Sequence, residues 1–484
     1  MLQNKTTKIL TEIGNFFSEK NIKNESASHH LLTFIKSLPS YLIKKHLPKK
    51  MKHNAQYSNY DLFILSLLMP GGGIENVKGY IGSYLNKIYL AGKDTFYRFE
   101  NCADINWRGI QYKVARHIVK LNDKIKVQSS VHSQNADEIT CLIIDDTDTK
   151  KTGKTIEFIS KIFSHATHRC VLGQKTLVLS FWNKNFLLPL EFSKHGEKNK
   201  SGSPLGMTAK QLEKRFSKNR NEDSPGLIRA QQYAEDKIST GIEMIKRATR
   251  KGFRAQYVLH DSWFFCERLL KTCVELQVKV VGMAKMAKAK YTFYHKDYTA
   301  KELLDSSLKK KLTKRCRSLK SEYAEFTVEY KGVTIKLFFS KFTKKGTWNL
   351  LITNDLKLSY IQAVKIYSKR WAIEVMFKEL KQYLGFEKCQ SVDFDAHIAH
   401  ATQCFIQYAI LSHLKQAYQY ETIGDLFREI NNSNKIFSIA DVIWNLILDI
   451  LTYMAELFDF DLHEVLTKYF KQDIKCAYIM KLAS

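Results

Sequence analysis

The order of apolar segments between residues 139 and 285 constrains the fold of this chain more than any other feature of its sequence. Five short segments have the length and the apolar, β-branched content expected of buried strands, and they cover residues 139–146, 175–182, 185–192, 255–261 and 278–285. Only two residues separate the second segment from the third, which predicts a β-hairpin. Helical patterns separate the third segment from the fourth and the fourth from the fifth.

Three consecutive strands followed by alternating helices and strands are the element order of the ribonuclease H-like core, in which helices flank a mixed sheet. We therefore expect an α/β protein with a ribonuclease H-like core, a β-rich insertion and flanking helical regions. The predicted parts are a helical region at 1–126, a polar linker at 127–137, the first part of the core at 137–286, the insertion at 287–355, the last part of the core at 356–393 and a helical region at 394–484.

The chain carries a large excess of positive charge. Its 76 lysines and arginines outnumber its 48 aspartates and glutamates, which gives a net charge of +28. Such a charge repels itself unless a polyanion neutralises it, so nucleic acid is the first candidate partner. The basic residues are spread along the chain between many tyrosines and phenylalanines, which indicates several surfaces that contact a nucleic-acid backbone.

The sequence also argues against secretion, a disulfide framework and a membrane span. Nine cysteines show no CxxC pair and no zinc-ligand spacing, which favours reduced and mostly buried thiols. The first residues lack the apolar core of a signal peptide. The most apolar late segment, 438–458, is interrupted by Asp441, Asp449 and Glu456. We expect a cytoplasmic protein without a membrane-spanning segment.

Residues 367–387 are predicted to form one amphipathic helix with an unusual polar face. Offsets of 0, 3, 7, 11 and 14 residues fall within a sector of roughly 80°. The side chains on this stripe are Tyr367, Arg370, Glu374, Lys378 and Lys381, and the apolar residues Ile373, Met376, Phe377, Leu380 and Leu384 lie on the opposite side. A solvated face with ion pairs four residues apart is one interpretation. A functional surface is the other.

Acidic residues stand where strand ends and this helix can converge. The first strand ends in Asp145 and Asp146, the fourth ends at Asp261, and the helix carries Glu374. Carboxylates are hard oxygen ligands, and three of them can hold two Mg²⁺ ions about 4 Å apart. Two such ions activate a water or a 3′-hydroxyl for phosphodiester cleavage or transfer. Asp261 taken alone is more typical of a turn residue or a helix cap than of a metal ligand.

The spacing of Tyr367, Arg370, Glu374 and Lys381 resembles the YREK signature of the DDE transposases of bacterial insertion sequences, in the family numbered four. The segments "LIIDDT" and "YVLHDSWF" resemble the first and second aspartate blocks of that family. A β-rich insertion before the glutamate helix is a further hallmark of the group. The resemblance covers about residues 137–415.

The resemblance implies that Asp146, Asp261 and Glu374 are the catalytic residues and hold two Mg²⁺ ions, with Mn²⁺ as a substitute. Asp146 is preferred over Asp145 because Thr147 follows it, as a threonine often follows the family's aspartate, and Asp145 stays an alternative. The same resemblance implies that DNA is contacted by Tyr367, Arg370, Lys378, Lys381 and Trp348. Trp348 stands about one residue from the position of the family's base-stacking tryptophan, so a role as a core aromatic residue stays open.

The resemblance also implies cut-and-paste transposition of DNA in the bacterial cytoplasm, with the protein associated with the nucleoid when bound. A homodimer would bind the terminal inverted repeats, cleave through a hairpin intermediate and join the element to target DNA. Residues 1–126 would then bind DNA, and residues 394–484 would serve dimerisation. Two other functions stay open, namely a stand-alone nuclease on the same core and a catalytically inactive, transposase-derived DNA-binding protein.

Overall fold

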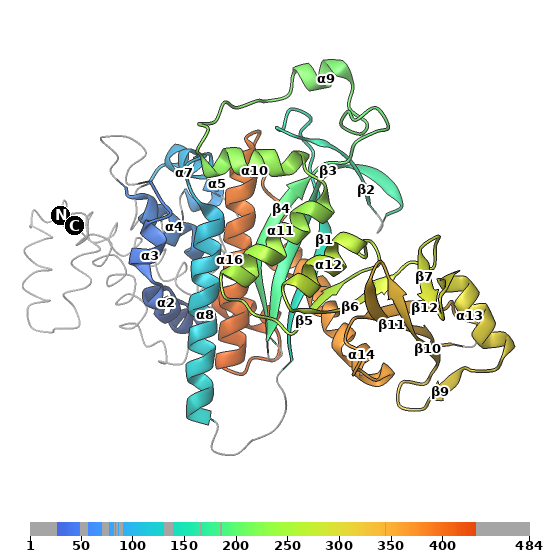
Figure 1. Ribbon diagram of the computed structural model, residues 1–484. Coiled ribbons are helices and arrows are strands. Elements are labelled where there is room, and N and C mark those ends of the chain that lie inside the picture. The colour runs from blue at the N-terminus through green and yellow to red at the C-terminus, as the bar shows by residue number, and fades with distance from the viewer. Residues whose placement is uncertain are drawn as a thin grey trace, which may run out of the picture. The chain divides into compact units, whose positions relative to one another are not determined.

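The computed structural model describes residues 27–48, 57–69, 77–81, 83, 86, 91–129, 139–164, 167–183, 186–343 and 345–431 (Figure 1). The chain divides into two compact units. The smaller comprises 1–38, 49–99 and 418–484, and the larger comprises 39–48 and 100–417. Residues 1–26 of the predicted helical region 1–126 and most of the predicted region 394–484 lie outside the described residues. Within the described residues, no helix combines the length and the apolar character needed to cross a membrane.

Most described helices of the smaller unit come from the first hundred residues of the chain, and residues 423–431 add a further helical stretch. The helices from the first hundred residues are α2 (Ala27–Ser37), α4 (Asn59–Leu68), α5 (Val77–Tyr80) and α7 (Lys93–Glu100), the last of which ends at the unit boundary. Ser58 caps α4, since its side chain accepts a hydrogen bond from the Asp61 amide while the Asp61 carboxylate accepts one from the Ser58 amide. This reciprocal cap marks the start of α4, which lies within the predicted helical region 1–126.

A mixed β-sheet forms the centre of the larger unit. Its five core strands, in spatial order, are β4 (Phe186–His195), β3 (Arg169–Asn183), β1 (Thr140–Lys150), β5 (Tyr257–His260) and β6 (Lys279–Ala284). β1, β5 and β6 run parallel to one another, and β3 runs antiparallel to both β1 and β4. This order and these directions confirm the predicted ribonuclease H-like mixed sheet.

Helices cover both faces of this sheet. α11 (Lys237–Arg250) packs on one face, because a Cβ added at Gly241 would meet Ile144 of β1. α15 (Trp371–Tyr383) packs on the other face, where Met376 lies 4.0 Å from the Ser180 hydroxyl of β3. Ser180 pairs with Ile143, so these two residues lie on the face that α15 covers. Ile144, the next residue of β1, faces α11, because side chains alternate along a strand.

The remaining helices of the larger unit surround this three-layer core. They are α3 (Ser40–Lys44), α8 (Trp107–Ser129), α9 (Ala209–Glu213), α10 (Pro225–Ala234), α12 (Glu267–Glu275), α14 (Tyr360–Tyr367) and α16 (Phe394–Ala417). α8 and α16 pack on each other and on β4. Both helices come from regions that the sequence analysis placed outside the core, and they bury the outer strand of the core sheet.

The insertion continues the same sheet beyond β6 (Figure 1). Its elements are β7 (Lys290–Phe293), β8 (Lys296–Thr299), α13 (Ala300–Lys309), β9 (Lys314–Cys316), β10 (Ser321–Tyr330), β11 (Val333–Lys341) and β12 (Asn349–Thr353). Within this predicted β-rich insertion, β10 and β11 form an antiparallel hairpin. Lys331 and Gly332 join them with φ angles of 51° and 81°, which is typical of a two-residue hairpin turn.

Three local predictions differ from the structure. The segment 367–387 is not one helix, because α14 ends at Tyr367, a 3₁₀ turn follows at Ser368–Arg370, and α15 ends at Tyr383, before Gly385 adopts a φ of 62°. Trp348 lies immediately before β12 rather than within it. A further strand, β2 (Ser160–Ser164), pairs with the start of β3, and its polar ends hid it from the apolar pattern.

Candidate active site

The carboxyl ends of β1 and β5 bring two acidic segments together. In the parallel ladder Ile144 is paired with His260, so Asp145 and Asp261 follow at adjoining positions. Asp261 also shapes the turn after β5, since its carboxylate accepts a hydrogen bond from the Trp263 amide at 3.0 Å. Neighbouring parallel strands place their carboxyl ends at one sheet edge, where α/β proteins commonly bind ligands.

Glu374 and Arg370 reach the same place from α15 and the 3₁₀ turn before it. The guanidinium of Arg370 pairs with the Asp145 carboxylate through one nitrogen and with the Glu374 carboxylate through the other. The side chains of Asp145 and Arg370 are only 13% and 16% exposed, so water screens their ion pair weakly. Arg370 therefore lies between the carboxylates of the central strand and of the helix.

The charges of the neighbouring acids affect the pKa of Asp145. The pKa of Asp145 is raised to about 7, chiefly by burial and also by the charges of Asp261 and Asp146, while Arg370 opposes the shift. Burial lowers the pKa of Arg370, but the carboxylates of Asp145 and Glu374 outweigh it, so the net shift is upward. The site thus concentrates negative charge within a basic chain.

Asp146, the predicted first ligand, points to the opposite face of the sheet. Its carboxylate pairs with Lys237 at the start of α11. The Lys237 ammonium in turn lies 4.1 Å from the ring centre of Trp263. The structure therefore brings Asp145, rather than Asp146, to Arg370 and Glu374. The physical reason is the alternation of side chains along β1, which turns adjacent residues to different helices.

The predicted DNA-contacting residues occupy different positions. The Arg370 guanidinium lies 5.8 Å from the ring centre of Tyr367, and burial raises the Tyr367 pKa to about 12. Lys378 is exposed on α15, and Lys381 pairs with Glu387 at 3.5 Å. The half-buried Trp348 has the Lys341 ammonium 5.9 Å from its ring centre. Tyr367 and Arg370 thus join the acidic site, whereas the recorded partners of Lys381 and Trp348 are not its acids.

The donor set fits a hard divalent cation by its chemistry, since Asp145, Asp261 and Glu374 all offer carboxylate oxygens. The described residues nevertheless contain no group of three or more histidine, cysteine, aspartate or glutamate side chains already arranged around one ion. The Arg370 guanidinium explains this arrangement, because it pairs with two of the three acids. A cation that bound there would take over the charge that Arg370 now neutralises.

Sequence reasoning overlooked Lys237 and Trp263, which lie beside the acids. Trp263 follows Asp261 by two residues and is 41% exposed, an unusual exposure for so large an aromatic side chain. Its position in "HDSW", directly after a predicted strand, was the signal in the sequence that could have identified it. A tryptophan in the turn after a buried strand has little apolar surface to cover it, so its exposure could have been expected. No pattern in the sequence connected Lys237 with Asp146, 91 residues before it.

A mixed sheet of this order, with carboxylates at the adjoining ends of its parallel strands and on a flanking helix, defines a ribonuclease H-like enzyme that acts on phosphodiester bonds. The family model described as "DDE superfamily endonuclease" matches residues 46–300, more than half of the chain, and the chain belongs to this family. A second model, "Transposase DDE domain", matches residues 226–410. The curated proteins contain no match to the chain.

The two matched ranges together include every acid of the site. The first contains Asp145, Asp146 and Asp261, and the second contains Asp261 and Glu374. Membership of this family supports a transposase or endonuclease with nuclease-type catalysis and a DNA substrate. The fold and the family therefore agree on the class of reaction.

Proposed function

We propose that this protein is a DNA transposase that excises an insertion sequence and joins it to target DNA. The observation that carries the proposal is the pairing of Arg370 with Asp145 and Glu374, close to the charge of Asp261, in a chain with a matched transposase domain. The spacing of Tyr367, Arg370, Glu374 and Lys381 further supports membership of the group with the YREK signature.

We assign the catalytic carboxylates to Asp145, Asp261 and Glu374, which would hold two divalent ions, Mg²⁺ or Mn²⁺. Ions bound there would activate the attacking hydroxyl and stabilise the leaving oxygen. Asp145 replaces Asp146 in this assignment because it faces Arg370 and Glu374. The role of Asp146 is then to pair with Lys237 and position the start of α11 beside the acids.

Arg370 would position DNA by exchanging a carboxylate for a phosphate. In the DNA-free chain it pairs with Asp145 and Glu374. A phosphate of the bound strand offers a bidentate partner of equal geometry, and arginine suits such pairing. The Tyr367 hydroxyl is protonated at neutral pH and can donate a hydrogen bond to the same backbone, and burial, which raises its pKa to about 12, extends this to alkaline pH.

The remaining steps follow from the resemblance to the insertion-sequence transposases. Lys378, exposed on α15, and Lys381 would contact flanking phosphates, and Trp348 would stack on a flipped base of a hairpin intermediate. A homodimer in the cytoplasm would bind the two terminal inverted repeats. The basic helices of residues 1–126 would read those repeats.

The test is cleavage of a plasmid that carries the element's own ends by the full-length protein with Mg²⁺. We expect Asp145→Asn, Asp261→Asn and Glu374→Gln to bind the ends but to cleave at least about a hundredfold more slowly, a loss of several kcal/mol of transition-state stabilisation. Asp146→Asn, at the neighbouring position, is the matched control and should retain most of the activity.

Each other result points elsewhere. If Asp146→Asn abolishes cleavage and Asp145→Asn does not, the first carboxylate is Asp146. Cleavage without joining to target DNA would favour the stand-alone nuclease. Binding of the ends without cleavage under any divalent ion would favour an inactive DNA-binding protein.

A further inference from the structure

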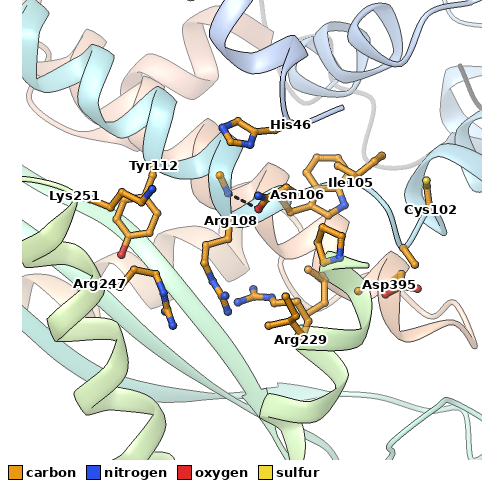
Figure 2. A pocket seen from close by; sticks show the side chains of 17 residues that line it. His46, Cys102, Ile105, Asn106, Arg108, Tyr112, Arg229, Arg247, Lys251 and Asp395 are labelled. Carbon is orange, nitrogen blue, oxygen red and sulfur yellow. Dashed lines mark hydrogen bonds between the residues drawn. The ribbon is translucent and has the colours of Figure 1, made fainter. Parts of the chain in front are cut away.

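A cavity of about 250 Å³ lies within the larger unit, apart from the carboxylates of β1, β5 and α15. Its walls come from α8 and the segment that precedes it, from α10, from the end of α11 with Lys251 after it, from His46 after α3 and from the start of α16 (Figure 2). A single water needs only about 10–15 Å³ by this kind of measure, so the cavity has room for a polyatomic ligand.

Four arginine and lysine side chains form part of the lining. Arg108, Arg229, Arg247 and Lys251 all border the cavity, and Figure 2 shows the first three converging from different helices. Asp395 also lines it, but its carboxylate is already engaged by Lys218 at 2.8 Å and by Arg220 at 3.1 Å. Lys218 and Arg220 therefore neutralise the charge of Asp395, and neither belongs to this group of arginines.

One buried carboxylate forms ion pairs with two of the arginines. Glu191, which is 1% exposed, pairs with Arg108 at 2.7 Å and with Arg247, and it also accepts a hydrogen bond from the Tyr112 hydroxyl at 2.9 Å. Glu191 is thus the carboxylate in direct contact with this group, whereas Glu235 and Glu243 act on Arg108 and Arg247 through their charges. Among the described residues no carboxylate contacts Arg229, and a phosphate would supply the negative charge that it lacks.

Arg229 is the least satisfied member of the group. Its side chain donates to the Phe192 carbonyl at 2.5 Å and lies 4.4 Å from the Phe192 ring centre. Its residue is only 7% exposed, and its Nε finds no hydrogen-bond partner among the described residues. Burial lowers its pKa, as does the charge of Arg108. Burying a guanidinium without a counter-charge is costly, so the site is incomplete as it stands.

Two helix N-termini border the same cavity. α8 has 23 residues and begins at Trp107, and α10 has 10 residues and begins at Pro225, and both first turns contribute lining residues. Helix N-termini carry partial positive charge and favour anions. They add to the field of the arginines, and four basic groups with several N–H donors suit the three or four oxygens of a phosphate better than the two of a carboxylate.

We propose that this cavity binds a phosphate group, with Arg108, Arg229 and Arg247 as its donors. The phosphate belongs either to a small soluble molecule or to the backbone of bound DNA. The site is separate from the carboxylates of the proposed active site and does not depend on their chemistry.

The test measures binding of inorganic phosphate and of pyrophosphate to the full-length protein by calorimetry, in a phosphate-free buffer of constant ionic strength. Arg229→Gln removes the buried guanidinium. Lys251→Gln changes an exposed residue of the rim, so it probes the site even if Arg229→Gln fails to fold. Arg250→Gln, exposed on the same helix as Arg247 and outside the cavity lining, is the matched control.

We expect Arg229→Gln to weaken phosphate binding at least about tenfold, which is the loss of one charge-assisted hydrogen bond, and Lys251→Gln to weaken it less. Arg250→Gln should bind as the parent does. A second arm repeats the titration with saturating duplex DNA. Loss of phosphate binding in that arm assigns the site to a DNA phosphate, and its persistence assigns it to a free molecule.

The proposal is overturned if the parent and both cavity variants bind phosphate equally, because the anion then lies elsewhere. It is also overturned if the parent binds neither anion and both cavity variants bind DNA as the parent does. In either case the arginines serve only to hold Glu191 within the core. Loss of DNA cleavage alone would not bear on the site.

Discussion

Arg370→Gln should destabilise the metal-free protein near the acidic site. The substitution leaves the Asp145 and Glu374 carboxylates without the guanidinium that joins them. Removing one partner of a fully buried ion pair costs about 3–5 kcal/mol. Glu374 is 34% exposed and water screens part of its charge, so we expect a loss of about 2–4 kcal/mol.

Mg²⁺ should reverse much of this loss. A cation that binds the three carboxylates replaces the missing positive charge, and at a hundred times its Kd it stabilises the folded state by about 2.7 kcal/mol. In the parent the ion must first displace Arg370, so its stabilising effect there should be smaller. Mg²⁺ is therefore expected to protect the variant more than the parent.

The assay is hydrogen exchange of peptides from β1 and α15, measured in EDTA and in Mg²⁺, because it reports local opening in a chain of two units. Lys381→Gln is the matched control on the same helix. Its pair with Glu387 is about one-third exposed on both sides and should contribute at most about 1 kcal/mol. Equal exchange of the parent and Arg370→Gln in EDTA, or equal protection of both by Mg²⁺, would refute this reasoning.

Three further predictions concern groups around the core. Burial lowers the pKa of Lys194 from 10.5 to about 7, so its stability contribution is fully present above pH 10.5 and is lost as pH falls through 7. Lys194→Met should therefore be more stable than the parent at pH 6, by roughly 3–5 kcal/mol, and the gain should disappear at high pH in urea unfolding. Arg220 is 2% exposed and pairs with Glu157, so Arg220→Met should cost about 3–5 kcal/mol by thermal unfolding. A Cβ on Gly282 would lie 2.3 Å from the ring of His260, which precedes Asp261, so Gly282→Ala should cost about 1–3 kcal/mol and slow DNA cleavage.

Controls separate these effects from general damage. Lys271→Met replaces an exposed lysine and should show no pH-dependent gain, in contrast to Lys194→Met. A double variant of Arg220 and Glu157 should lose less than the sum of the two single losses if the pair is direct. Normal cleavage by Gly282→Ala would show that His260 does not position Asp261.

The element order of the core was predictable because buried strands leave a strong signal. Each core strand contains a short apolar run, and β3, β4, β5 and β6 are buried over most of their length. Helix α15 was predictable for the same reason, since Ile373, Met376 and Leu380 are fully buried at helical spacing. The strand β2 alternates buried and exposed residues over only five positions, which is too short a pattern to separate from a loop.

The choice between Asp145 and Asp146 could not be made from the pattern of β1. Helices cover both faces of that strand, so its residues from Cys141 to Ile144 are all buried and show no alternation. Without alternation, nothing in the segment indicates which aspartate faces α15. Only the packing of α11 and α15 on opposite faces separates the two side chains.

The cavity among the arginines was equally hidden from the sequence. Arg108, Arg229 and Arg247 come from three helices that are separated by more than a hundred residues at their extremes. Each arginine taken singly is one of many basic residues in a chain of net charge +28. Arg108 and Arg247 meet at Glu191, and Arg229 meets the Phe192 carbonyl, because α8, α10 and α11 pack on β4.

The sequence by itself determined the mixed sheet, the β-rich insertion, the basic character and the acidic positions of this protein. These features depend on local periodicity and on composition. Both can be read from residues close together in the chain, without knowledge of long-range contacts. The tertiary structure alone decided that Asp145 meets Arg370, that Asp146 meets Lys237, and that Arg229 is buried without a full set of partners. Such pairings join residues far apart in the chain, and only the packing of helices on the sheet fixes which of them come within reach.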